Sequence, residues 1–167
     1  KMPIPILQDL QGPKIRVGKL DQDQIEIKSD EFIEITTDKI IGNEKLISCS
    51  YEQLVDDSRI GNQILIDDGL IKLEIIEKKG KSVICKILEG GTLKPKKGMN
   101  LPGMKLSTPA FTETDKKNME LAFKHRVDYV ALSFVRSAED IYNLREWMKK
   151  RGYDKPIIAK IEKPEAV

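Results

Sequence analysis

The chain has 167 residues, of which 40% are hydrophobic and 34% are charged, a balance typical of a folded globular protein. Its 29 basic and 27 acidic residues give a net charge of +2, which excludes a broad electrostatic surface for nucleic acid or an anionic membrane. The longest apolar stretches fall far short of the roughly 20 residues that span a bilayer. We therefore expect a small-molecule partner in a local pocket, with no nucleic acid and no membrane contact.

The N-terminus and the cysteines indicate the cellular location. Residues 1–7 lack the basic region and the small-residue cleavage site of a signal peptide, and they resemble an interior strand. Cys49 and Cys85 show no metal-ligand spacing, and His125 is the single histidine. A reducing, cytoplasmic setting and a sequence that begins within a fold are the expectations.

An all-β domain is predicted for residues 18–101. Apolar and polar residues alternate with period two in Ile25–Ile27, Phe32–Ile35 and Leu73–Glu77, a pattern typical of half-buried antiparallel strands. Turn residues separate these segments at the spacing of a small β-barrel or sandwich. The loop 94–103, rich in Pro and Gly, is expected to end the domain because neither residue continues a regular element.

Two helix-start signals lie in residues 102–167. Thr112 and Asp115 form a pattern like a capping box, which predicts a helix through about His125. Residues 137–140, with Ser first and Asp last, repeat the pattern before a second predicted helix.

Nearly continuous apolar runs, Tyr129–Val135 and Pro156–Ile161, alternate with these helices and are typical of buried parallel strands. Ile4–Leu7 is expected to add a third strand. Polar groups at strand ends in a β–α–β rhythm are typical of a (β/α)₈ barrel. The predicted fold is thus α/β plus all-β, a partial TIM barrel (residues 1–17 and 102–167) with the β domain inserted as a small β-barrel cap. At least five more barrel strands would lie outside this sequence.

The first candidate site follows the first predicted strand, where Asp9, Lys14 and Arg16 share one loop with two glycines. Gly12 and Pro13 stiffen the loop, so Lys14 and Arg16, two residues apart, should project together in extended geometry. Paired cations of this kind suit an anionic ligand such as phosphate, and the alternative is a solvated turn.

The second candidate is Lys160 with Glu162, at the end of an apolar strand. Period two places the ammonium and the carboxylate on one face. The alternatives are a structural ion pair or a catalytic pair, and a position at the C-terminal end of a barrel strand favours catalysis.

Residues 9–16, Asp-Leu-Gln-Gly-Pro-Lys-Ile-Arg, resemble the Asp-Leu-x-Gly-Pro-Lys-Ile-Arg signature of pyruvate kinases, and residues 158–167 resemble the active-site lysine motif of that family. Residues 66–71, 100–103 and 127–136 extend the similarity over essentially the whole chain. The resemblance implies phosphoryl transfer from phosphoenolpyruvate to ADP, giving pyruvate and ATP in the last step of glycolysis. It also implies Mg²⁺ (or Mn²⁺) as cofactor and a homotetrameric parent.

The same resemblance implies roles for individual residues. Lys160 matches the catalytic lysine, and Glu162 matches a carboxylate ligand of Mg²⁺. Arg16 matches an arginine that contacts phosphate and is also expected to act in catalysis.

Four further positions match residues near substrate or nucleotide. Ser133 and Phe134 match positions that line the substrate-phosphate and nucleotide region, although by themselves they resemble core-strand residues. Asp67 or Asp68 would lie on a cap hairpin that closes over the nucleotide, and a plain hairpin turn is the alternative.

Asp9 matches the carboxylate that helps bind a monovalent cation in many members of the family. Leu10 stands where those members have Thr, and Lys14 stands where they have Glu. The ammonium of Lys14 could then take the electrostatic role of K⁺. The sequence thus predicts an enzyme that does not require K⁺.

Two other functions remain open at this stage. The β domain could be a nucleotide-binding module without catalysis, or the protein could be a barrel aldolase or lyase acting on enolates. Under the pyruvate kinase interpretation the isolated chain is expected to be inactive, because a partner metal ligand and most barrel strands would be missing.

Overall fold

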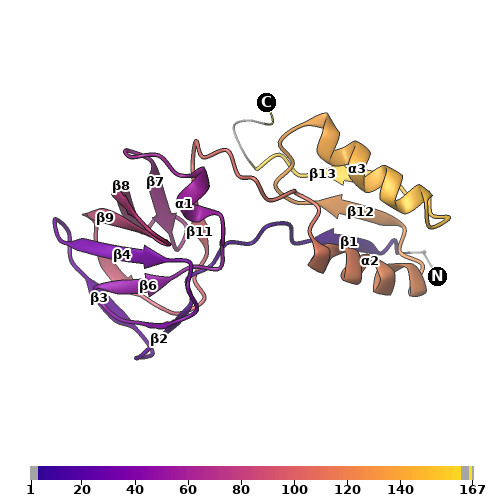
Figure 1. Ribbon diagram of the computed structural model, residues 1–167. Helices are drawn as coiled ribbons and strands as arrows, with labels where there is room; N and C mark the ends of the chain where they lie inside the picture. The colour runs from indigo at the N-terminus through magenta and orange to yellow at the C-terminus, as the bar shows by residue number, and fades with distance from the viewer. Residues whose placement is uncertain (1–3, 163–165, 167) are drawn as a thin grey trace. The chain divides into compact units, whose positions relative to one another are not determined.

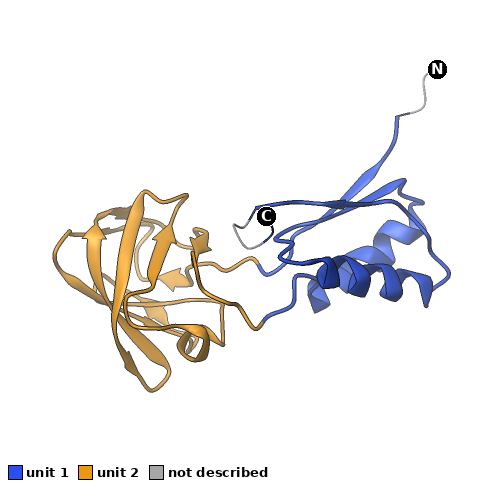
Figure 2. Cartoon of the chain, turned by 90° about the horizontal axis from the view of Figure 1, so that it is seen from above, with its two compact units in different colours: residues 1–13, 108–167 blue, residues 14–107 orange. Residues whose placement is uncertain are grey.

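The structure, a computed structural model, describes residues 4–162 and 166. The chain divides into two compact units, coloured separately in Figure 2. Residues 14–107 form the β unit, and the described residues of 1–13 and 108–167 form the α/β unit. Each unit has its own hydrophobic core. Among the described residues, no helix is both long and apolar enough to cross a membrane.

A parallel sheet of three strands is the centre of the α/β unit (Figure 1). In spatial order the strands are β1 (Leu7–Leu10), β12 (Tyr129–Leu132) and β13 (Ile157–Ala159). Leu10 pairs with Leu132, which in turn pairs with Ala159, so the three strands end at the same level. The predicted parallel arrangement is confirmed for these strands.

The first strand differs from its predicted position, Ile4–Leu7, and spans Leu7–Leu10 instead. Pro5 has no backbone N–H to donate to a sheet, whereas Gln8–Leu10 pair with Val130–Leu132. Asp9, expected in a loop, therefore lies inside a strand.

Helices α2 (Glu113–Lys124) and α3 (Ala138–Lys149) connect the strands, and both lie on the same face of the sheet (Figure 2). The predicted capping box of Thr112 and Asp115 is confirmed at the start of α2, which ends at His125 as its C-cap. Side chains from the strands and both helices pack into a core whose fully buried members include Leu10, Met119, Val130, Leu132, Leu144 and Met148.

This packing decides which residues face away from the helices. Leu10, Val130 and Leu132 belong to the core shared with α2 and α3. Because successive side chains of a strand alternate between faces, Asp9 and Ala131 face the opposite side of the sheet. Ser133 and Lys160, each two residues after a residue on this face, continue the alternation and lie on the same side as Asp9.

The β unit is built around a six-stranded sheet, in the order β11-β7-β8-β9-β4-β6, with two further strand pairs, β10-β3 and β2-β5 (Figure 1). The bounds of its elements are β2 Lys19–Leu20, β3 Ile25–Ile27, β4 Phe32–Thr36, β5 Ile41–Gly42, β6 Leu46–Ser48, α1 Leu54–Asp57, β7 Gln63–Ile66, β8 Ile71–Lys79, β9 Ser82–Glu89, β10 Gly91–Leu93 and β11 Met99–Asn100. Alternating residues such as Leu73 and Ile75 of β8 are fully buried, as the period-two pattern predicted.

Two strand pairs depart from the predicted antiparallel arrangement. β4 pairs with β6, and β2 pairs with β5, in parallel. After β4 the chain does not turn back in a hairpin. It first forms β5, which pairs with β2, and then β6, which joins the sheet beside β4 and runs in the same direction. Alternation along a strand does not encode the direction of its neighbour.

Candidate active site

A cluster centred on Lys160 lies where the three parallel strands end. The Lys160 ammonium donates to both carboxylate oxygens of Asp9, at 3.1 and 3.2 Å, and to the Ser133 hydroxyl at 2.9 Å. Asp9 belongs to β1, Ser133 follows β12 and Lys160 follows β13. The expectation that polar groups gather at the strand ends is confirmed for these side chains.

Ser133 connects the lysine to the backbone of β1. The residue is 4% exposed, and its Oγ donates to the Leu10 carbonyl at 2.6 Å while accepting the hydrogen bond from Lys160. A hydroxyl has a single hydrogen, so donation to Leu10 leaves its lone pairs for donors. Ser133 therefore presents acceptor character toward the ammonium.

Glu162 adds a second carboxylate to the cluster. Its Oε1 lies 3.4 Å from the Lys160 ammonium, and its Oε2 accepts a hydrogen bond from the Phe134 N–H at 3.0 Å. The expected placement of Lys160 and Glu162 on one face is confirmed by this contact. Phe134 has a φ of +55°, a left-handed conformation that is uncommon for a bulky residue and turns its N–H toward the carboxylate.

Opposing effects act on the pKa of Lys160. Partial desolvation of the ammonium lowers the pKa, but the hydrogen bond with Asp9 and the negative charges of Glu162 and Asp9 outweigh it. The pKa of Lys160 therefore lies above the ordinary lysine value of 10.5. Lys160 is a fixed positive charge at neutral pH.

We expect Asp9→Asn to lower the pKa of Lys160, because it removes a full negative charge and an acceptor oxygen while preserving side-chain shape. Since the wild-type pKa is raised, the stability gained from the contact is present below the ordinary lysine pKa and is lost as pH rises through the raised value. NMR titration of ¹⁵Nζ-labelled lysine measures the shift. Asp154→Asn, at an exposed site, is the control. An unchanged Lys160 pKa in Asp9→Asn would contradict this account.

Glu162 and Asp9 are the carboxylates that could contribute to a metal site here. Within residues 4–162, no three His, Cys, Asp or Glu side chains form a group able to hold a metal ion. Mg²⁺ commonly binds one or two carboxylates and completes its octahedron with water and substrate oxygens, so a small donor set is compatible with it. Each Glu162 oxygen has one contact in the cluster and keeps a lone pair for a further ligand.

Arg16 and Lys14 lie in the β unit, and the two side chains differ in their surroundings. The Arg16 backbone N–H donates to the Ser50 hydroxyl at 2.9 Å, and its guanidinium donates to the Lys96 carbonyl at 2.7 Å. Arg16 is partly buried, whereas Lys14 is exposed. The structure thus anchors Arg16 within the β unit and leaves Lys14 on its surface.

Asp67 and Asp68 form the turn between β7 and β8, together with Gly69. All three have positive φ, of 54°, 55° and 91°, which aspartate and glycine tolerate better than most residues. The Asp67 carboxylate pairs with the Lys97 ammonium at 2.9 Å, and Asp68 is exposed. Asp67 therefore has a structural contact, while Asp68 is available to solvent.

Sequence reasoning missed a further residue near the cluster. Asp115 was predicted only as a helix cap, yet its carboxylate also accepts hydrogen bonds from the backbone N–H groups of Gln11, at 3.0 Å, and Gly12, at 3.3 Å. More than 100 residues separate these partners in sequence. No local pattern indicated this contact.

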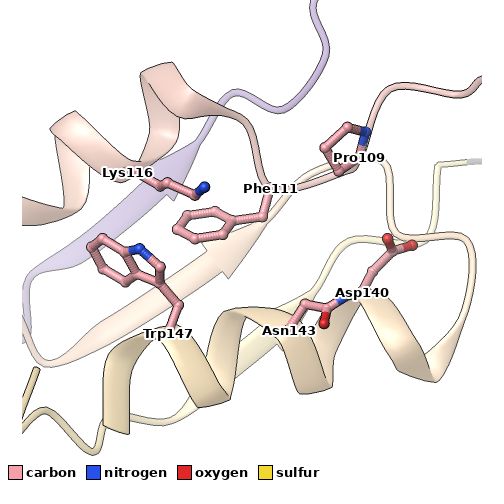
Figure 3. Close-up of a pocket in the computed structure, with 6 residues that line it drawn as sticks. All are labelled: Pro109, Phe111, Lys116, Asp140, Asn143 and Trp147. Carbon is pink, nitrogen blue, oxygen red and sulfur yellow. The ribbon is translucent and has the colours of Figure 1, made fainter. Parts of the chain in front are cut away.

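A separate shallow pocket lies between α2 and α3, away from the Lys160 cluster, with a volume of about 240 Å³ (Figure 3). The rings of Phe111 and Trp147 meet edge to face at 5.2 Å within it. Lys116 pairs with Glu113 and Asp140 accepts from the start of α3, so these polar groups already have partners. The complete lining is Pro109, Phe111, Lys116, Asp140, Asn143 and Trp147.

Comparison with known proteins gives a consistent family. A family model described as the pyruvate kinase barrel domain matches residues 1–167. Pyruvate kinase of Corynebacterium efficiens is 43% identical over 164 residues, covering 98% of this chain and 35% of that protein. Pyruvate kinase of Thermotoga maritima is 38% identical over 167 residues, covering 100% of this chain and 36% of that protein.

A solved structure agrees with the sequence comparisons. The crystal structure of a pyruvate kinase from Cryptosporidium parvum matches with a TM-score of 0.87 at 35% identity, covering 96% of this chain and 34% of that one. The chain thus spans about a third of the length of the relatives it matches.

Proposed function

The chain belongs to the pyruvate kinase family, and we propose that it is the segment of a longer enzyme that transfers the phosphoryl group of phosphoenolpyruvate to ADP. The observation that carries this proposal is the convergence of Lys160, Asp9, Ser133 and Glu162 at the ends of three parallel strands. A fixed cation flanked by carboxylates, where strands pass into helices, suits a reaction in which negative charge moves. The products are pyruvate and ATP, in the last step of glycolysis.

Lys160 is the proposed catalytic cation. As the P–O bond of phosphoenolpyruvate breaks and a new bond forms to the terminal phosphate oxygen of ADP, negative charge develops on the enolate oxygen, and the enolate then takes up a proton to give pyruvate. The Lys160 ammonium would stabilise the transferring group and this oxygen. The hydrogen bond with Asp9 and the negative charges of Glu162 and Asp9 raise the pKa of Lys160 and so favour its charged form, which fits the role.

Glu162 is the proposed protein ligand of Mg²⁺, or of Mn²⁺ in its place. When bound, the ion supplies positive charge that neutralises phosphoryl oxygens. The Phe134 N–H orients Glu162 through Oε2. Ser133 and Phe134 would line the region of substrate phosphate and nucleotide, and the Leu10 carbonyl fixes the Ser133 hydroxyl.

Residues of the β unit would serve the phosphate and nucleotide side of the reaction. Arg16 would contact phosphate, and the β7–β8 turn with Asp67 and Asp68 would close over the nucleotide. Two observations support these roles: Asp68 is exposed, and the Arg16 guanidinium is held by a hydrogen bond to the Lys96 carbonyl.

The complete enzyme is proposed to be a cytoplasmic homotetramer. Its (β/α)₈ barrel is proposed to include residues 1–17 and 102–167, with residues 18–101 as the inserted β-barrel cap. The compact units of the structure divide at slightly different positions, after residues 13 and 107, so that Arg16 lies in the β unit. The chain alone is expected to be inactive, because the remaining strands of the barrel and a second metal ligand would come from outside these residues.

K⁺ is proposed to be unnecessary for activity. The family resemblance implies that Asp9 matches a residue of a monovalent-cation pocket and that Lys14 stands where many members of the family carry Glu. An ammonium in place of a carboxylate would supply the positive charge that K⁺ provides elsewhere and would repel a second cation.

A coupled lactate dehydrogenase assay of the full-length protein tests the proposal. We expect turnover of phosphoenolpyruvate and ADP with Mg²⁺, equally with and without K⁺. In the same assay Lys14→Glu should lower the activity measured without K⁺, and added K⁺ should restore part of that activity. Lys19→Glu, at an exposed site of the β unit, should leave the activity unchanged with or without K⁺.

Three other results of these assays would contradict part or all of the proposal. Strict activation by K⁺ with Lys14 intact would overturn the cation proposal alone. ADP binding without turnover would favour a nucleotide-binding β module, and carbon–carbon cleavage of an enolate precursor would favour an aldolase or lyase.

A further inference from the structure

Asp115 is buried completely, with a relative exposure of 0%, and both of its carboxylate oxygens are occupied. Oδ2 accepts from the Thr112 N–H at 3.0 Å and from the Thr112 hydroxyl at 2.6 Å. Oδ1 accepts from the N–H groups of Gln11 and Gly12. A buried carboxylate is costly unless it is hydrogen-bonded, and four donors meet that need.

The two oxygens do different work. Oδ2 completes the capping box at the start of α2, which requires no other contact. Oδ1 has its contacts outside the helix: it accepts hydrogen bonds from the backbone of residues 11 and 12, directly after the end of β1. Helix capping alone would be met by Glu, the usual acid of a capping box, so the contact of Oδ1 is an additional role.

The segment that Asp115 binds lies against the other side of the site. Gly12 has a φ of +63°, and a side chain at that position would approach Phe134 Cδ2 to 3.1 Å and the Ser133 carbonyl to 3.2 Å. The Ser133 hydroxyl binds the Leu10 carbonyl in the same segment. Residues 10–12 are therefore fixed from one side by Asp115 and from the other by Ser133 and Phe134.

Both carboxylates that contact Lys160 depend on this segment. Asp9 precedes it by one residue, and Glu162 binds the N–H of Phe134, which packs against Gly12. Movement of residues 11 and 12 would shift Asp9 relative to the ammonium and would free Phe134 to move with Glu162. Displacements of about 1 Å in such positioning groups can lower a rate by about 100-fold.

We propose that Asp115 is a positioning residue, which through its Oδ1 fixes residues 11 and 12 and thereby the arrangement of Asp9 and Glu162 around Lys160. Its catalytic consequence rests on the proposed phosphoryl transfer. Its structural consequence, the ordering of residues 11 and 12, does not.

The test compares Asp115→Asn with two matched controls in the full-length protein. An amide has one acceptor oxygen, and the contacts with Thr112 belong to the local capping box, so Asp115→Asn is expected to keep those contacts and to lose the acceptor for residues 11 and 12. Thr112→Ala weakens the same helix cap and leaves Oδ1 in place. Asp140→Asn removes the equivalent acid at the start of α3, whose contacts are local, with Arg136 and Ser137.

Two readouts are measured on each variant: hydrogen–deuterium exchange of the peptide that covers residues 8–16, and kcat with KM for phosphoenolpyruvate. Asp115→Asn is expected to accelerate exchange of two amides in that peptide and to lower kcat by about 100-fold. Both controls should keep wild-type exchange in the peptide and near wild-type kcat, although their melting temperatures fall. If Asp115 only stabilised the helix, all three variants would have a lower melting temperature, and Asp115→Asn would differ from the controls neither in the exchange of residues 8–16 nor in kcat.

The proposal is overturned if exchange in residues 8–16 is the same in Asp115→Asn and Thr112→Ala, or if exchange rises while kcat matches the controls. Should Asp115→Asn not fold, Asp115→Glu is measured by the same criteria, because it keeps the charge and the capping box but displaces the carboxylate by one methylene. A wild-type enzyme without turnover would refute the proposed function, and the exchange result would then decide the role of Asp115 by itself.

Discussion

Lys160→Met in the full-length protein is expected to lower kcat for phosphoenolpyruvate and ADP by about 1,000-fold. Methionine has nearly the length of lysine but carries no charge, so the enolate oxygen and the transferring phosphoryl group would lose a fixed cation. The substitution would also remove the ammonium that the carboxylates of Asp9 and Glu162 both contact. Because the loss concerns charge that develops during the reaction, kcat should fall more than KM rises.

Steady-state kinetics by the coupled assay measure this effect, with circular dichroism to show that the fold is retained. Lys149→Met is the matched control, because Lys149 is exposed near the end of α3 and away from the cluster. Lys160→Arg gives a second comparison, since it keeps the charge but changes the donor geometry. A kcat near the wild-type value in Lys160→Met would show that Lys160 is not the catalytic cation.

Glu162→Gln is the second substitution with a large expected effect, a fall in kcat/KM of about 100-fold or more. Glutamine preserves the shape and can still accept from the Phe134 N–H, so the backbone near Phe134 should stay in place. What disappears is the negative charge beside Lys160 and the hard anionic ligand for Mg²⁺. The concentration of Mg²⁺ needed for half-maximal activity should rise at the same time.

Titration of activity with Mg²⁺, and of bound Mn²⁺ by electron paramagnetic resonance, separates the two consequences. Glu120→Gln, at an exposed position of α2, changes the net charge equally and should leave both curves unchanged. If Glu162→Gln lowers the rate without altering Mn²⁺ binding, Glu162 acts on Lys160 and does not bind the metal. Unchanged rate and unchanged binding would exclude both roles.

Much of the local structure could be predicted from the sequence, because it depends on neighbouring residues. The capping box of Thr112 and Asp115 predicted the start of α2, and period-two alternation predicted β8 with its buried Leu73 and Ile75. Period two also placed Lys160 and Glu162 on one face, and their contact confirms it. These signals lie within a few residues of the feature that they determine.

The boundaries and directions of strands were less accessible. β1 begins at Leu7 and continues through Asp9, because hydrogen bonds with β12 extend it past the apolar residues. β4 and β6 run parallel, although the alternation in Phe32–Ile35 is typical of an antiparallel strand. In both cases a partner strand that is distant in sequence decides the outcome.

By itself, the sequence determined the order of the elements, the residue types at the strand ends and, through its motifs, the family resemblance. Only the tertiary structure decided that the Lys160 ammonium lies on Asp9 and Ser133, and that Asp115 binds the backbone of Gln11 and Gly12. The physical reason is the distance along the chain: 151 residues separate Lys160 from Asp9, and 104 separate Gln11 from Asp115. Contacts of that span form only when packing of strands and helices brings their ends together, which no local pattern records.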